Sequence, residues 1–118
     1  MGTNYQQGYA FENRIVRKLN AQGGLAYRTA GSHSPVDITY WDSNGFSYLI
    51  QCKHSKKKDL DIKGLLCEDN TIKLKELTID PITIKVLLIK QPRSRDVVQL
   101  CWNQVQLKWQ LQNVFDLK

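Results

Sequence analysis

The sequence has no long apolar run and no recognisable targeting segment. Its longest uninterrupted apolar stretch is Val86 to Ile89, far short of the ~20 residues that a membrane-spanning helix needs. Residues 1–4 are polar or small and are not typical of a signal peptide. We therefore expect a soluble cytoplasmic protein that acts inside the cell and has no membrane partner.

The sequence also has few cysteines. Cys52, Cys67 and Cys101 lie far apart and form no CxxC pair, which argues against a zinc knuckle and against a secreted disulfide framework. We expect three free thiols. The chain also has no internal repeat, linker or biased tract, so residues 1–118 are expected to form one domain.

The charge is unbalanced toward the basic side. The chain carries 17 Lys and Arg against 11 Asp and Glu, a net charge of +6, while 42% of its residues are hydrophobic. This composition excludes a disordered tail or a collagen-like chain. The positive surplus favours a polyanionic partner, with nucleic acid ahead of a membrane surface.

Hydrophobic periodicity predicts an α/β protein. A helix is expected over residues 8–22, because apolar residues recur at helical spacing from Ile15 to Leu19 and Gly23 supplies a stop. Glu12 falls on the same stripe, so one acid points toward the core. Strands are expected over 25–30, 36–42, 46–53, 82–89, 97–102 and 104–112, and a further helix between 68 and 78. This order indicates a mixed sheet with helices packed against it.

The turn at residues 43–45 decides which side chains meet across the first hairpin. A two-residue turn would pair Asp37 with Cys52, whereas a three-residue loop with a left-handed glycine at its end pairs Asp37 with Gln51. Strand alternation places Gln51 and Lys53 on one face. We expect the second register, because it brings Asp37, Gln51 and Lys53 together.

Glu12, Asp37, Gln51 and Lys53 form a set suited to phosphodiester hydrolysis. That reaction needs oxygen ligands for a hard divalent cation, an activated water and a fixed positive charge beside the phosphate. Asp37 is a candidate direct ligand, Gln51 offers a side-chain carbonyl, and the backbone carbonyl of Cys52 adds a third oxygen. Lys53 is the candidate group for orienting water and stabilising charge.

These residues resemble a known family, the archaeal Holliday junction resolvases of the PD-(D/E)xK nuclease superfamily, including versions encoded by archaeal viruses. The match is dense over residues 8–53. It is carried by Gly8…Phe11-Glu12…Leu19…Gly23…Arg28-Thr29-Ala30-Gly31-Ser32-His33-Ser34-Pro35-Val36-Asp37…Leu49-Ile50-Gln51-Cys52-Lys53.

The resemblance implies a restriction-endonuclease-like fold and assigns roles to several residues. Glu12 is the helix acid, Asp37 the metal-binding aspartate and Lys53 the motif lysine, while Ser32 and Arg28 are active-site or phosphate-contacting residues. It also implies Mg²⁺, for which Mn²⁺ can substitute, a homodimer, and four-way junction DNA as the substrate.

The chain departs from the family at Gln51, where the family usually has glutamate. Glutamine coordinates through a neutral oxygen, so metal affinity is expected to fall and Glu12 to become more necessary. On this reasoning Gln51→Glu keeps or raises activity at low magnesium.

Basic residues close to the predicted site are candidate DNA contacts. Lys56, Lys57 and Lys58 follow the site directly and either contact phosphate or form a solubilising loop. His33 lies beside Ser32 in a glycine- and proline-bounded loop, where turn chemistry is the alternative reading.

Three functions stay open from the sequence. The first is a Holliday junction resolvase, and the second is a nuclease of the same fold that acts on nicked, flapped or single-stranded DNA. The third is a nucleic-acid-binding module whose metal site is weakened by Gln51 and whose positive charge does the remaining work.

Overall fold

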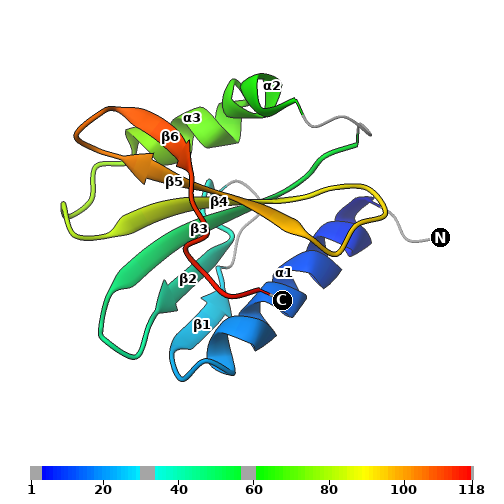
Figure 1. Cartoon of the computed structure of the whole chain (residues 1–118), viewed down its shortest axis with the longest axis horizontal. Coiled ribbons are helices and arrows are strands. Elements are labelled where there is room, and N and C mark those ends of the chain that lie inside the picture. The colour runs from blue at the N-terminus through cyan, green and yellow to red at the C-terminus, as the bar shows by residue number, and fades with distance from the viewer. Residues whose placement is uncertain (1–3, 30–33, 57–60, 118) are drawn as a thin grey trace.

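The computed structural model is a six-stranded sheet with helices packed on both of its faces (Figure 1). It describes residues 4–29, 34–56 and 61–117. Within these ranges the elements are, in chain order, α1 (Asn4–Asn20), β1 (Leu25–Arg28), β2 (Ile38–Trp41), β3 (Ser47–His54), α2 (Ile62–Leu66), α3 (Asp69–Glu76), β4 (Ile84–Lys90), β5 (Val97–Asn103) and β6 (Lys108–Leu111).

The strands lie in the sheet in the order in which they occur in the chain. In the described part of the chain, β3 and β4 pair in parallel, and every other neighbouring pair is antiparallel. A parallel pair needs a crossover connection, and here α2 and α3 supply it. The expected α/β class, with a mixed sheet flanked by helices, is confirmed.

One face of the sheet is covered by α1. Phe11, Ile15 and Leu19 lie one helical turn apart and are buried against β2, β3 and β4. The helix begins earlier than the expected residue 8 and ends at Asn20. Gly23 has φ +91°, so it provides the left-handed stop that the sequence predicts.

The hairpin between β2 and β3 adopts the three-residue loop expected from the sequence. The Asp42 N–H donates to the Phe46 carbonyl at 3.0 Å, and Gly45 has φ +87°. Ile38 then pairs with Ile50. Tyr48 and Ile50 face α1, which leaves Gln51 and Lys53 on the opposite face.

The opposite face carries the second core, under α2 and α3. Leu74 from α3 packs with Leu87 and Ile89 from β4. The run from Val86 to Ile89 is fully buried, because α1 covers one side of β4 and α3 the other. The central position expected for this apolar strand is therefore confirmed.

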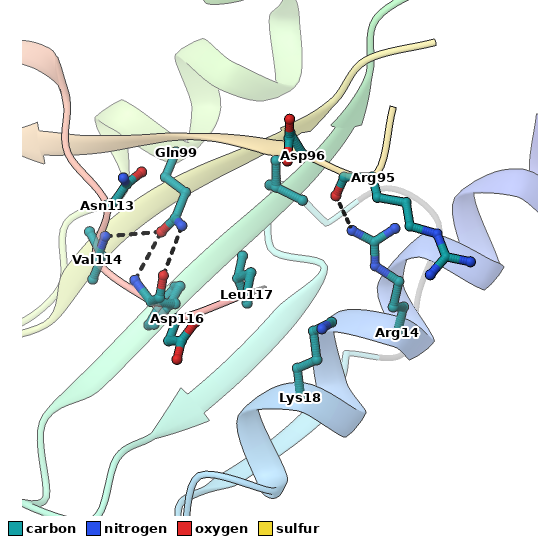
Figure 2. Close-up of a pocket in the computed structure, with 11 residues that line it drawn as sticks. Arg14, Lys18, Arg95, Asp96, Gln99, Asn113, Val114, Asp116 and Leu117 are labelled. Atoms are coloured by element: carbon teal, nitrogen blue, oxygen red, sulfur yellow. Dashed lines mark hydrogen bonds between the residues drawn. The ribbon is translucent and has the colours of Figure 1, made fainter. Parts of the chain in front are cut away.

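The C-terminal segment is fastened to the sheet by one buried side chain (Figure 2). Gln99 accepts hydrogen bonds from the Val114 and Phe115 N–H groups at 2.9 Å each, and its amide donates to the Phe115 carbonyl at 2.9 Å. These bonds hold the Phe115 ring against the α1 side of the sheet, where it contacts Tyr40 and Tyr48.

The expectation of one strand over residues 104–112 is wrong. Residues 104–107 form a turn, in which Asn103 Oδ1 accepts from the Val105 and Gln106 N–H groups. Leu107 has φ +54°. The alternating pattern continues through this turn, so periodicity alone does not reveal it.

Two further observations concern the cysteines and the helices of the described chain. Cys52, Cys67 and Cys101 are free. No helix in the described ranges is both long and apolar enough to cross a membrane.

Candidate functional site

Asp37 directly precedes β2 and lies beside β3. Its N–H donates to the Ile50 carbonyl at 2.8 Å, although Ile38 is the register partner of Ile50. Two consecutive residues thus face one, which is a β-bulge, a feature that re-aims a side chain. Here it directs Asp37 Oδ2 to the Cys52 N–H at 2.8 Å.

Glu12 approaches this carboxylate from α1. Its side chain is 17% exposed, and Glu12 Oε1 accepts from Arg28 Nε at 3.2 Å. The Arg28 guanidinium also lies over the Tyr9 ring, 4.1 Å from its centroid. Helix α1 therefore brings Glu12 close enough for its charge to act on Asp37. Strand β1 supplies Arg28, the cation that pairs with Glu12.

Burial has the largest effect on the charge of Asp37. Burial raises its pKa to about 6, the Cys52 N–H opposes this shift, and the Glu12 charge adds to it, while Lys53 and Arg28 lower it. The pKa of the Cys52 thiol is raised well above its usual value by burial and by the charges of Asp37 and Glu12. A cation placed between the two carboxylates would relieve this repulsion.

The Cys52 backbone contributes more than a hydrogen-bond donor. In a strand, the N–H and C=O of one residue point to the same side. Because the Cys52 N–H faces Asp37, which directly precedes the start of β2, we expect its carbonyl oxygen on that same side of β3. The carbonyl is therefore available to the region that the Asp37 carboxylate occupies.

Lys53 is buried on the opposite face of β3 and is paired with an acid that the sequence analysis missed. Its side chain is 8% exposed, and its Nζ donates to Glu68 Oε1 at 2.6 Å. Glu68 directly precedes α3. The crossover between two parallel strands returns α3 over β3, so an acid at the start of the helix predicted after residue 68 was the available signal.

The expected convergence of Asp37, Gln51 and Lys53 is wrong, because Gln51 and Lys53 lie on the α3 face of β3, away from the carboxylates. Gln51 is 3% exposed, and its amide donates to the Pro35 and Asn70 carbonyls at 2.8 Å and 2.9 Å. Its Oε1 lies 3.2 Å from Thr71 Oγ1. The expected role of Gln51 as an oxygen ligand does not agree with this arrangement, because its hydrogen bonds tie β3 to α3.

Of the remaining predicted residues, only Lys56 and Arg28 lie in the described part of the chain. Lys56 is exposed just beyond the end of β3. Arg28, expected to contact phosphate, is engaged by Glu12 and Tyr9. Four other candidates lie outside the described residues: Ser32, His33, Lys57 and Lys58.

The donors around Asp37 fit a hard divalent cation, although they are few. Among the described residues, no group of three or more His, Cys, Asp or Glu side chains comes together as a metal site. The set consists of two carboxylates, Asp37 and Glu12, and the Cys52 carbonyl. Mg²⁺ commonly takes one or two carboxylates and keeps several waters, so these oxygen donors suit it without Gln51.

No protein-family model matches the chain, and no curated protein matches it either. A similar solved structure is that of Hjc from Archaeoglobus fulgidus, a Holliday junction resolvase from an archaeal hyperthermophile. The two share 16% sequence identity with a TM-score of 0.48, over 80% of this chain and 75% of that one.

Proposed function

We propose that the protein is a metal-dependent endonuclease that cuts DNA at four-way junctions, as the sequence resemblance to the resolvases implies. One observation carries the proposal: the Asp37 carboxylate, bonded to the Cys52 N–H at 2.8 Å, feels the charges of both Glu12 and Lys53. Two acids and a lysine are the groups that metal-assisted phosphodiester hydrolysis uses, and here the acids lie on the α1 side of β3 and the lysine on its other face.

In this proposal, Asp37, the Cys52 carbonyl and Glu12 hold Mg²⁺ or Mn²⁺, with Glu12 acting directly or through water. The bound metal supplies charge stabilisation at the phosphoryl group and lowers the pKa of water. Arg28 positions the Glu12 carboxylate through the 3.2 Å bond between Nε and Oε1.

Lys53 remains the proposed group for orienting the attacking water and stabilising charge on the phosphate, and this role requires its ammonium to act from the opposite face of β3, where it pairs with Glu68. Its burial limits the positions that the ammonium can take, and the 2.6 Å contact with Glu68 fixes it further. An ammonium held in this way loses little freedom when the substrate arrives. Glu68 is therefore a positioning residue for Lys53.

The proposed DNA contacts are the polar and basic residues that the sequence places near the site. Ser32 and Arg28 follow from the resemblance, and His33 and Lys56 to Lys58 from their closeness to the site in the sequence. A net charge of +6 favours attraction to the phosphate backbone. We expect affinity to fall steeply with salt, because lysine and arginine contacts release counterions.

A homodimer is part of the same proposal. Resolution of a four-way junction requires two strands to be cut, and an isologous dimer provides two equivalent sites. Apolar side chains are available for such an interface around the β5–β6 hairpin, where Val105, Leu107 and Leu111 are 92%, 65% and 69% exposed.

The deciding experiment is a cleavage panel. Labelled four-way junction, linear duplex, nicked, flapped and single-stranded DNA are incubated with Mg²⁺, Mn²⁺ or a chelator. We expect junction cleavage that the chelator abolishes and that Asp37→Asn lowers on the order of a hundredfold or more. Glu76→Gln, which removes an exposed acid from the end of α3, is the matched control. Preference for another DNA form would change the substrate but keep the nuclease.

The engagement of Gln51 by α3 favours a second candidate, a nucleic-acid-binding module without catalysis. A side chain that bonds Pro35, Asn70 and Thr71 contributes to the fold and adds nothing to metal affinity. This candidate predicts DNA binding that Mg²⁺ does not alter and no cleavage with any metal. Calorimetric titration with Mg²⁺ separates the two functions.

A further inference from the structure

A basic cavity lies on the other flank of α1 from the Glu12–Arg28 pair. It has a volume of about 680 Å³ and is bordered by α1 and by the carboxyl ends of the parallel strands β3 and β4. Four of its lining residues carry full positive charges: Arg14, Lys56, Lys90 and Arg93. No described residue that lines it carries a carboxylate.

Three of these cations have no acidic partner among the described residues. Among the described residues, no carboxylate lies within salt-bridge distance of Lys56, Lys90 or Arg93. Arg14 donates from Nη2 to the Arg95 carbonyl at 2.8 Å, but its buried Nε has no hydrogen-bond partner in the described structure. A buried donor without an acceptor is costly, and an anion in the cavity would satisfy it.

The backbone at Arg93 is a separate observation that points to the same place. Ser94 N–H donates to the Gln91 carbonyl, Pro92 stands at the second position of this turn, and Arg93 follows with φ +57°. Glycine is the residue usually found at positive φ in such a turn. An arginine there carries a backbone penalty, a situation that clusters at binding sites.

A comparison within the molecule shows that this cavity is distinctive. A larger cavity of about 1060 Å³ is lined by Arg14, Lys18 and Arg95, but also by Asp96 and Asp116 (Figure 2). Its charges are therefore largely balanced, and a polyanion gains little there. The smaller cavity lacks such acids in the described residues, which makes it the better phosphate site.

Its position relates it to the candidate cleavage centre. The cavity is lined by Phe11 and His54, whose rings meet edge-on at 5.4 Å. His54 follows Cys52 on the same face of β3, roughly 7 Å further along the strand. A DNA strand cut beside Asp37 would therefore carry a neighbouring phosphate past the cavity.

We propose that this cavity binds a phosphate group of the DNA substrate, next to the phosphate that is cut. The inference rests on the proposed nuclease function for its choice of ligand. Bound there, the phosphate accepts hydrogen bonds from Arg14, Lys90 and Arg93, and the strand acquires a fixed register relative to the cleavage centre.

The variants for the test are chosen so that they fold. Arg93→Gly removes the charge and also relieves the positive φ, whereas Arg93→Lys keeps the charge. Lys90→Gln removes a second cation. Arg17→Gln, at an exposed position of α1 that does not line the cavity, is the matched control.

The first arm measures DNA affinity with a chelator present, so that no cleavage occurs. We expect Arg93→Gly and Lys90→Gln each to weaken binding about fivefold to tenfold and to reduce the salt slope by roughly one. Arg93→Lys retains most of the affinity and Arg17→Gln retains all of it. Equal affinities for Arg93→Gly and Arg17→Gln would overturn the inference.

The second arm uses inorganic phosphate and does not depend on nuclease activity. Saturable NMR shifts at Lys90 and Arg93 that disappear in Arg93→Gly support the site, and their absence overturns it. If the wild-type protein cleaves DNA but neither arm gives the expected result, the proposed phosphate site is refuted and the nuclease function is not. A protein that binds phosphate here but cleaves no DNA refutes the nuclease and leaves an anion site.

Discussion

Lys53 Nζ lies 2.6 Å from Glu68 Oε1, and the two side chains differ sharply in exposure, at 8% for Lys53 and 49% for Glu68. The lysine is enclosed between β3 and the start of α3, whereas its partner borders solvent. Glu68, which directly precedes α3, thus helps to fix the position of the Lys53 ammonium on β3.

Glu68→Gln tests this relationship. Removing the charge leaves a buried ammonium with a weaker partner, so we expect the free energy of unfolding to fall by roughly 1 kcal/mol. Cleavage should fall about threefold to tenfold, with KM little changed, because the lysine is less well placed. Glu76→Gln serves as the control in denaturant unfolding and in steady-state kinetics. An unchanged kcat would show that Glu68 does not position Lys53 for cleavage.

Asp37 gives a prediction on pH and stability. Its pKa is about 6 in the folded protein against an ordinary value of 3.8, so the folded state holds the proton more tightly than the unfolded state. The ionised carboxylate therefore destabilises the fold fully above pH 6, and this penalty disappears as the pH falls toward 3.8.

Asp37→Asn should remove that penalty, since its amide oxygen still accepts from the Cys52 N–H. We expect a gain on the order of 1 to 3 kcal/mol at pH 8 and none at pH 4. Urea unfolding without metal at both pH values measures this difference. A gain of the same size at pH 4 would show that charge is not its cause.

Gln51→Glu now carries the opposite expectation from the one that the metal-ligand hypothesis gives. A carboxylate at this position would face the Pro35 and Asn70 carbonyl oxygens, which currently accept from the amide. We expect a loss of roughly 2 to 4 kcal/mol in unfolding free energy. Gln112→Glu, an exposed position, is the control. If activity instead rises at low magnesium and stability is unchanged, the hypothesis that Gln51 is a metal ligand would be supported.

Leu111→Glu tests the homodimer. The side chain is 69% exposed on β6, at the edge of the sheet, so a charge there costs the monomer little and disfavours an apolar interface. Sedimentation should show a monomer for the variant and a dimer for the wild type. Junction cutting in two strands should be lost while nicking of one strand persists. If the Leu111→Glu variant is still a dimer, the dimer interface lies on another surface.

The hairpin that presents Asp37 could be predicted from the sequence because its determinants are local. Asn44-Gly45 sets the loop, and the alternation along β3 fixes which side chains share a face. The bulge at Asp37 was not predicted, because a residue that shares Ile50 with its neighbour leaves no signal in the pattern.

The contacts of Gln51 and Lys53 could not be predicted in the same way. Their partners, Asn70, Thr71 and Glu68, come from the crossover, whose position depends on how α3 packs against β4. Leu107 shows a related limit: an alternating apolar pattern indicates a strand, and nothing in a leucine reports a positive φ.

In the described sheet, β3 and β4 form the single parallel pair and separate two meanders, β1–β3 and β4–β6. Within each meander, neighbouring strands are antiparallel. Such meanders form fast, because their strands are near in sequence. Pairing of β3 with β4 is slower, because it closes a long loop. Glu12 on α1 and Asp37 just before β2 both come before the parallel pair in the chain. The basic cavity joins Lys56, which follows β3, to Lys90 at the end of β4, so in refolding, followed by pulsed hydrogen exchange, the acids should meet before the cations do.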